Sequence, residues 1–446
     1  MNLLYRRLTY SFFIIVFLVL TPLIILYTQG YRYSFDHKVV QKTGILIVSS
    51  DPKNADIFLN DKKYEDKNTP AKIKNLLPGD YEIKLAKEGY HSWQKQLPIY
   101  ENSTTFAEKV LLWKKEQPAI IASDLPETYQ TSPNNTKLAM INLDQSVATL
   151  NLNENIITIG PDLSKYDSLD ILNWSNTSKK IIVQGKTSQA DKPTYLIINL
   201  ENLKNKTTIL NSSYLPNNPV TIKWDLTSDN TIYSSNDQGI WQTNIFEKEK
   251  SLIFETTEVQ DFLISAGELY YIKNKQLFYK NLKQDRGSEV LQKLGSNSFI
   301  FLTPAGDKLF MLNKEHKELL IIDPNNSTPK LSIPANDIAW LNSETLLAYN
   351  EWELWIYNIN NNEPELITRM GKPISKAIWH PRGQHIIFVS DAKLKIIELD
   401  NRELRTTIAL TDIEDINSLN INNSGSRIYF SGKTTEETGF FALDIR

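Results

Sequence analysis

The residues that could perform chemistry are few and scattered along this chain. The histidines are His37, His91, His316, His380 and His385, and the last two stand five positions apart. They flank an expected turn and have no visible third ligand, so the sequence favours a contact of His380 with the turn backbone over a metal site. The chain has no Gly-x-Ser-x-Gly elbow, no Walker loop and no Gly-x-Gly-x-x-Gly motif. We therefore expect no catalytic, cofactor-binding or metal-binding residues, and no enzymatic activity.

Composition narrows the classes of function further. The 52 acidic residues are numerous enough to form a pair for glycoside hydrolysis, but abundance alone is no evidence for one. The absence of cysteine excludes disulfides, thiolate chemistry and cysteine-ligated zinc. A formal charge of −3 and a pI near 6.1 provide no basic field for a nucleic acid. We expect no nucleic-acid partner.

Four tryptophans share one position of an internal repeat: Trp174, Trp224, Trp340 and Trp379. One interpretation is an aromatic lining that stacks on sugars or cations. The other is packing between neighbouring repeats, and it is favoured because Leu302 and Ile421 occupy the same position in other copies. Outside this set, Tyr90, Trp93 and Trp352 are the candidates for surface contacts with a partner.

The repeat occurs eight times between residue 118 and the C-terminus, and the clearest copy runs from Ala377 to Asn401. Its anchor position is held by Thr131, Trp174, Trp224, Ile264, Leu302, Trp340, Trp379 and Ile421, which are 38 to 50 residues apart. Four short strands in about 40 residues are typical of one blade of a β-propeller. The sequence therefore predicts an eight-bladed propeller over 118–446. Seven blades are the alternative if the weak Ile264 copy is not a full blade.

The two ends of this region are expected to close the ring. The last copy stops at its third strand, Gly439 to Ile445, and lacks a fourth. An unassigned apolar run, Pro118 to Ser123, precedes the first copy. Pairing of these two segments would leave no long sheet edge exposed. The turn Trp379–Gly383, with its Trp-x-Pro-x-Gly pattern, resembles the propellers of the TolB and WD40 group.

An apolar segment near the N-terminus predicts where in the cell the protein is located. Residues Leu8 to Tyr27 include no charge, and 20 residues of helix span roughly 30 Å, the thickness of a hydrocarbon core. No small-x-small cleavage site follows, so an uncleaved anchor is favoured over a cleaved signal peptide. Arg6 and Arg7 precede the span, which favours a cytoplasmic N-terminus and export of the rest of the chain across the membrane. Residues 1–35 are thus interpreted as a cytoplasmic stub and a single-pass membrane anchor.

Between anchor and propeller, residues 44–113 alternate short strands and turns, which indicates a small β-sandwich. This stretch resembles the PEGA domain, an exported β-module, in residues that include Ser50, Pro52, Ala55, Asn60, Thr69, Pro70, Pro78, Gly79, Tyr81, Gly89, Tyr90 and Trp93. The naming tetrapeptide departs from the pattern, since Asn54 stands in it for glycine. Asparagine tolerates the left-handed turn conformation, so the fold should survive. The resemblance implies a structural or ligand-contacting module without catalytic residues.

Taken together, these features predict an all-β, membrane-anchored, exported interaction or scaffold protein of the bacterial cell envelope. Its partner would be an envelope protein or a glycan, bound through the propeller loops and the PEGA-like module. The alternative is a propeller enzyme that acts on envelope carbohydrate, with its site in the central funnel.

Overall fold

The computed structural model describes residues 3–34, 39–65, 67–123, 125–202, 207–284, 286–296, 298–326, 331–361, 363–434 and 437–446. Met1, Asn2 and Phe35, which belong to the predicted stub and anchor region, lie outside the described residues, as does His37. The chain forms two compact units. The first contains residues 1–116, 397–408 and Arg446, and the second contains residues 117–396 and 409–445.

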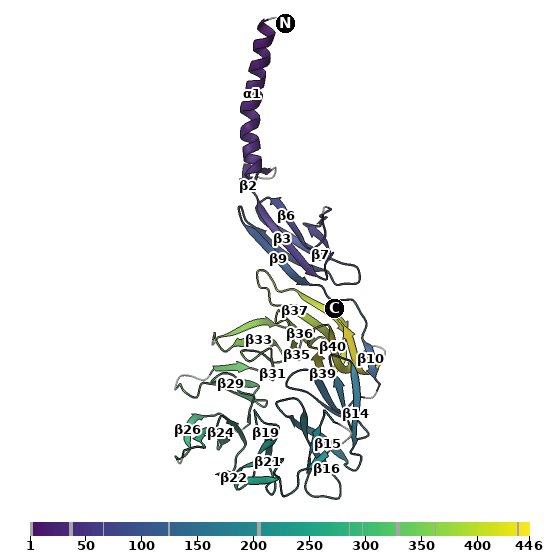
Figure 1. Cartoon of the computed structure of the whole chain (residues 1–446), viewed down its shortest axis with the longest axis vertical. Helices are drawn as coiled ribbons and strands as arrows, with labels where there is room; N and C mark the ends of the chain where they lie inside the picture. Colours follow the sequence, from purple (N-terminus) through teal and green to yellow (C-terminus); the bar gives the residue numbers. More distant parts are fainter. Residues whose placement is uncertain are drawn as a thin grey trace. The chain divides into compact units, whose positions relative to one another are not determined.

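The first unit begins with one long helix, α1 (Leu3–Thr28), which contains the predicted span and includes Pro22 (Figure 1). Its stretch Tyr5–Thr28 has a mean hydropathy of 2.5, and its apolar side chains are exposed, as for Phe17 at 66%. The helix is long and apolar enough to cross a membrane or to act as a signal sequence. A two-stranded ribbon follows, in which β1 (Tyr31–Ser34) pairs with β2 (Val39–Lys42).

Seven strands then form a sandwich of two sheets: β3 (Gly44–Asp51), β4 (Asp56–Leu59), β5 (Lys62–Lys63), β6 (Ala71–Leu76), β7 (Gly79–Ala86), β8 (Trp93–Ile99) and β9 (Thr104–Leu111). One sheet has the order β6-β3-β9 and the other has the order β5-β4-β7-β8. Every second residue of β3 is buried, as expected for a strand with one face on a core. The core lies between the sheets and includes Leu46, Ile57, Ile83 and Leu97.

The turn residues of this sandwich behave as their types predict. Asn54 has a φ of 63°, so asparagine does adopt the left-handed conformation that its position requires. Thr69 is buried, and its hydroxyl accepts a hydrogen bond from the Ala55 amide at 2.9 Å and bonds to the Ser50 hydroxyl at 2.6 Å. These residues are among those that carry the PEGA resemblance, and they fix the turn through buried polar contacts.

Residues 397–408 complete the first unit and contribute a buried ion pair. The Lys95 side chain is fully buried, and its ammonium contacts the Glu398 carboxylate and the Asp400 carbonyl oxygen, the latter at 2.7 Å. The other Glu398 oxygen accepts the Trp93 indole N–H at 2.9 Å. Arg402 donates to both carboxylate oxygens of Asp400. The cluster satisfies each of these charges, as burial requires.

The acid sensitivity of the first unit should depend on Asp400. Burial alone would raise the pKa of this carboxyl, but hydrogen bonds from Arg402 and the charge of Lys95 outweigh burial and hold the pKa at about 2. The ordinary value is about 3.9, so the folded state gains stability above that pH and loses it as the pH falls towards 2. Asp400→Asn should therefore flatten the fall in unfolding free energy between pH 4 and 2 in denaturant titrations. An unchanged slope would contradict this assignment.

From β10 to β41 the described residues form eight successive antiparallel sheets of four strands each; these sheets make up the second unit, except that the end of β37 and the start of β38 belong to residues 397–408 of the first. In chain order the sheets are β11–β14 (Thr128–Thr131, Lys137–Ile141, Ser146–Asn151, Ile156–Asp162), β15–β18 (Ser168–Trp174, Lys180–Lys186, Thr194–Asn199, Thr207–Ile209), β19–β22 (Thr221–Trp224, Thr231–Ser235, Gly239–Asn244, Glu249–Glu255) and β23–β26 (Asp261–Ser265, Glu268–Lys273, Gln276–Asn281, Glu289–Lys293). They continue as β27–β30 (Phe299–Phe301, Leu309–Asn313, Glu318–Ile322, Leu331–Pro334), β31–β34 (Asp337–Trp340, Thr345–Tyr349, Glu353–Asn358, Pro364–Arg369) and β35–β38 (Ile374–Trp379, His385–Ser390, Lys393–Glu398, Thr407–Asp412). The last sheet has the order β10-β41-β40-β39, with β10 (Ala119–Ala122), β39 (Glu414–Ile421), β40 (Arg427–Lys433) and β41 (Thr438–Asp444).

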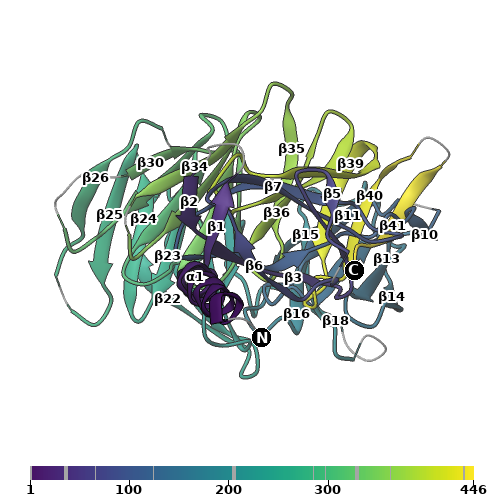
Figure 2. The ribbon, with the colours of Figure 1, turned by 90° about the horizontal axis from the view of Figure 1, so that it is seen from above.

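These sheets follow one another around a common centre, as the blades of a β-propeller do (Figure 1). The weak Ile264 copy, on which the seven-bladed alternative depended, forms a complete sheet, β23–β26. The closing pair predicted from the sequence is confirmed. β10 pairs with β41, with Ala119 opposite Ala442 and Ile120 opposite Phe441, and both views place these strands together (Figures 1 and 2).

The first and last sheets also share a hydrophobic core. Leu138, Leu150 and Leu152 of the first sheet and its following turn pack with Tyr429 and Phe440 of the last sheet. Tyr429 is fully buried, and its hydroxyl donates to the Leu152 carbonyl at 2.9 Å. Ring closure therefore rests on both backbone pairing and side-chain packing.

Candidate functional site

The repeat anchors lie in β11, β15, β19, β23, β31, β35 and β39, and the remaining anchor, Leu302, directly follows β27. The strands β15, β19, β31, β35 and β39 lie towards the centre of the ring (Figure 1). Two pockets are lined by these first strands and the turns that follow them. The charged pocket has a volume of about 520 Å³ and is lined mainly by residues 172–174, 220–226, 260–264 and 300–303. The neutral pocket has a volume of about 670 Å³ and is lined mainly by residues 130–133, 303–305, 338–343 and 419–421. Both include Pro133, Trp174, Asn176 and Thr303.

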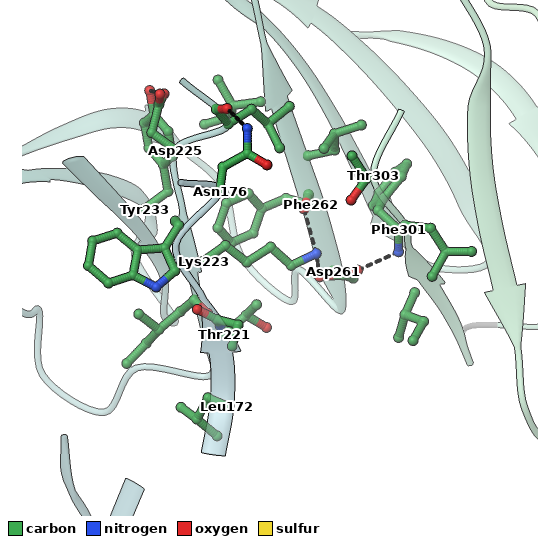
Figure 3. Close-up of a pocket in the computed structure, with 18 of the residues that line it drawn as sticks. Leu172, Asn176, Thr221, Lys223, Asp225, Tyr233, Asp261, Phe262, Phe301 and Thr303 are labelled. Atoms are coloured by element: carbon green, nitrogen blue, oxygen red, sulfur yellow. Dashed lines mark hydrogen bonds and ion pairs between the residues drawn. The ribbon is translucent and has the colours of Figure 1, made fainter. Parts of the chain in front are cut away.

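The charged pocket contains an ion pair that joins three sheets (Figure 3). The Lys223 ammonium, from β19, lies 2.6 Å from the Asp261 carboxylate and donates to the Phe262 carbonyl at 2.9 Å, both from β23. The other Asp261 oxygen accepts the Phe301 amide, from β27, at 2.7 Å. The ammonium also lies 5.7 Å from the Phe262 ring centroid, within cation–π range. The charges of Lys223 and Asp261 thus satisfy each other and the backbone.

Asp225 and Tyr233 form the second polar group of this pocket. The Tyr233 hydroxyl donates to Asp225 at 3.1 Å. Burial alone would raise the pKa of Asp225, but hydrogen bonds from Thr227, Tyr233 and Ser228 outweigh burial and lower the pKa below its ordinary value. Burial and the Asp225 carboxylate raise the pKa of Tyr233. At neutral pH the carboxylate is therefore ionised and the phenol protonated, a stable pairing rather than a poised acid or base.

The neutral pocket has a different chemistry, because no charged residue is among those that line it. Its polar groups are amides and hydroxyls, such as those of Gln130, Ser132, Asn342 and Ser343. Such groups bind uncharged polar ligands, including peptide backbones and sugar hydroxyls, without a large cost for desolvating an ion.

The anchor tryptophans line these pockets: Trp174, Trp224 and Trp379 are buried, whereas Trp340 is half-buried and packs edge-on against Phe310. The Trp174 indole donates to the Gln130 carbonyl of the preceding first strand at 3.1 Å, and Trp379 donates to the Ala339 carbonyl in the same way at 3.0 Å. Both side chains are less than a tenth exposed, as is Trp224. These contacts confirm packing between repeats as the role of Trp174 and Trp379. Their ring faces are not available for stacking on a sugar.

The three residues proposed from the sequence as surface contacts lie in different settings. Trp93 is 4% exposed, which does not fit a surface contact: its ring packs in the sandwich core, and its indole N–H is bonded to Glu398. Tyr90 is half-buried and packs against the same core. Trp352 is 45% exposed, in the turn before β33. Partner contacts at Tyr90 and Trp352 stay a prediction.

His380 also has structural partners. His380 is fully buried, its Nδ1 accepts the Arg382 amide of its own turn at 3.3 Å, and its Nε2 contacts the Gly425 carbonyl at 3.1 Å. The predicted backbone contact of His380 is confirmed. Within the described residues, no three His, Asp or Glu side chains group in a way that would hold a metal ion.

Sequence reasoning missed Lys223 and Asp261, although a signal was present. Asp261 and Asp337 each stand three residues before an anchor, in strands whose neighbours are apolar. A carboxylate in such a strand must find a partner, which is the reason to expect a cross-sheet ion pair. The partner of Asp261 is Lys223, 38 positions earlier, and only the folded structure identifies it.

A comparison with protein families supports the PEGA resemblance of the sandwich. Residues 43–112 match the PEGA domain. The match covers the β-sandwich from Thr43 to Leu112, so the resemblance seen in the sequence is confirmed over the same stretch. Among curated proteins, none matches the sequence of this chain.

The chain also resembles solved structures at low sequence identity. The C-terminal WD40 domain of Sif2 is 12% identical, with a TM-score of 0.49, over 74% of this chain and 98% of that one. Sqt1 of Saccharomyces cerevisiae is 11% identical, with a TM-score of 0.46, over 74% and 99%. PorZ, a surface component of the type-IX secretion system of Porphyromonas gingivalis, is 13% identical, with a TM-score of 0.41, over 72% and 43%.

Proposed function

We propose that this chain is a membrane-anchored, exported interaction protein of the bacterial cell envelope, which binds a protein or glycan partner at the inner pockets of its second unit. The observation that carries the proposal is the neutral pocket: about 670 Å³, lined by several sheets, with amides and hydroxyls but no charge. Its volume falls within the range of roughly 300–1,000 Å³ that is usual for ligand sites. The PEGA match supports an exported setting.

The alternative of a propeller enzyme acting on envelope carbohydrate has one observation in its favour. Lys223, Asp225 and Asp261 converge on the charged pocket from two neighbouring sheets. Catalysis needs a group poised to gain or lose a proton, whereas Lys223 pairs with Asp261, and Asp225 accepts from Tyr233. Release of reducing ends from cell-wall polysaccharide by the wild-type chain, lost in Asp225→Asn, would favour the enzyme.

Placement in the envelope is tested by the N-terminus of the mature chain. The proposal expects peptides spanning Leu8–Tyr27 to persist in the membrane fraction, and protease added to spheroplasts to degrade both units. A mature chain that starts after Tyr27, or full protection from external protease, would contradict anchoring or export respectively.

Partner binding is tested by photo-crosslinking in intact cells. A photoreactive residue at Ser343, an exposed position in the lining of the neutral pocket, should form covalent adducts with the partner. The matched control is Phe246, which is 84% exposed and lies in the turn between β21 and β22, outside both inner pockets. Equal adduct yields at the two positions, or none at Ser343, would reject the proposal.

A further inference from the structure

The outer rim of the second unit carries an exposed apolar surface on two adjacent sheets. The β10/β14 face consists of Ile120 (43% exposed), Leu143 (68%), Ile156 (54%), Ile157 (38%) and Ile159 (66%). Beside it lies a pocket of about 400 Å³, lined by residues that include Met140, Leu143, Ile157, Ile159 and Phe440. Leu143, Ile157 and Ile159 line the same pocket, so their exposed surfaces are contiguous, and contiguous apolar surface marks an interaction site more often than an ordinary surface does.

Strand β14 is an edge strand, because β13 is its neighbour on one side and no described strand pairs with the other. All four residues from Ile156 to Ile159 are exposed, so both faces of the strand are open. Its outer backbone amides and carbonyls therefore form a template for another strand.

The other outer strands have the features that normally block such pairing. Charges occur in β22 (Glu249, Lys250, Glu255), β26 (Glu289, Lys293), β34 (Glu365, Arg369) and β38 (Asp412). β30 ends in Pro334, β18 has three residues, and β10 has four and follows Pro118. The strand β14 itself ends in Pro161 and Asp162, but among the described outer strands it alone has four consecutive exposed residues without a charge, Ile156 to Ile159. Charged, short and proline-ended edges resist edge-to-edge association, whereas the segment Ile156–Ile159 of β14 contains neither a charge nor a proline and is exposed throughout.

The sequence of β14 is complementary to itself. In an antiparallel pair centred on Thr158, Ile157 of one copy stands opposite Ile159 of the other, and the paired segment Ile156–Gly160 contains no charged residue. The register shift between Ser146 and Ala148 on β13 interrupts regular pairing beyond Ile159, so the usable edge is short. Pairing about Thr158 is isologous and closes at two copies.

We propose that this face is a dimer interface, in which β14 pairs antiparallel with β14 of a second copy of this chain about a two-fold axis through Thr158. The two four-stranded sheets then form one continuous sheet, and the isoleucines and Leu143 are buried between the copies. The inference is independent of the ligand proposed for the inner pockets.

A single cysteine tests the pairing directly, because the chain has none of its own. The full-length Thr158→Cys variant, in nanodiscs or detergent micelles, is oxidised with copper phenanthroline. Opposed residues of an antiparallel pair have Cα atoms about 4.5–5.5 Å apart, which suits a disulfide. The expected product is a disulfide-linked dimer on a non-reducing gel. Val290→Cys is the matched control, since Val290 is 50% exposed in the outer strand β26.

A charge on the edge should separate the copies. Ile159→Lys, and Ile156→Lys as a second variant, are expected to weaken the dimer at least tenfold by analytical ultracentrifugation, whereas Val290→Lys leaves it unchanged. Both isoleucines are more than half exposed, so the fold should tolerate the change, and an unaltered circular dichroism spectrum checks this. A monomeric wild-type chain, equal crosslinking of Thr158→Cys and Val290→Cys, or a different protein's strand crosslinked at Thr158→Cys would overturn the proposal.

Discussion

Replacement of Tyr429 by alanine is expected to lower the free energy of unfolding of the second unit by about 3–5 kcal/mol, the usual cost of deleting a large buried ring. Tyr429 is fully buried in the cluster that joins the first and last sheets, and its hydroxyl bonds to Leu152. The cavity would therefore open where the ring closes. Denaturant unfolding followed by circular dichroism measures the loss.

Two further variants make this prediction specific. Tyr429→Phe keeps the ring and removes the bond to Leu152, so its cost should be about 1–3 kcal/mol, that of an unsatisfied buried carbonyl. Phe246→Ala removes an aromatic ring that is 84% exposed and should change stability by less than about 0.5 kcal/mol. If Tyr429→Ala costs no more than Phe246→Ala, the first and last sheets do not share a core.

Replacement of Lys95 by methionine is expected to cost the first unit about 3–5 kcal/mol, because removal of one partner leaves a buried charge uncompensated. The Lys95 side chain is fully buried, and that of Glu398 is 11% exposed. The double variant Lys95→Met/Glu398→Gln also removes the negative charge of Glu398, so it should recover part of the lost stability. The comparison uses the change in unfolding midpoint at pH 7.

An exposed ion pair provides the matched control. Lys317 lies 2.6 Å from Glu351, but their side chains are 51% and 44% exposed, so water screens the pair. Lys317→Met should therefore cost less than about 1 kcal/mol. A Lys95→Met variant as stable as Lys317→Met would show that the pair with Glu398 is not buried in solution.

The regular parts of this fold were predictable from the sequence because they depend on local patterns. Anchors at steps of 38 to 50 residues mark first strands, and the missing fourth strand of the last copy indicated that Pro118 to Ser123 would close the ring. Asn54 suited a left-handed turn by its residue type alone. In each case the physical cause lies within a few residues or in a repeated unit.

The contacts that failed or escaped prediction depend on residues far apart in the chain. Trp93 is buried in the sandwich core, and its indole N–H donates to Glu398, 305 positions later in the chain. Lys223 meets Asp261 only because two neighbouring first strands converge on one pocket. Asp261 in its apolar strand indicates that a partner is needed, but in neither pairing does the local sequence identify the partner among the many charged residues of the chain.

The most direct test of ring closure is a crosslink between the two ends of the second unit. Ala119 of β10 and Ala442 of β41 are opposed in the closing pair, and the chain has no cysteine of its own. Closure predicts that Ala119→Cys/Ala442→Cys forms an intramolecular disulfide under mild oxidation, whereas Ala119→Cys/Phe246→Cys does not. Free thiols at both positions of the first pair, in a folded chain, would contradict the closed ring.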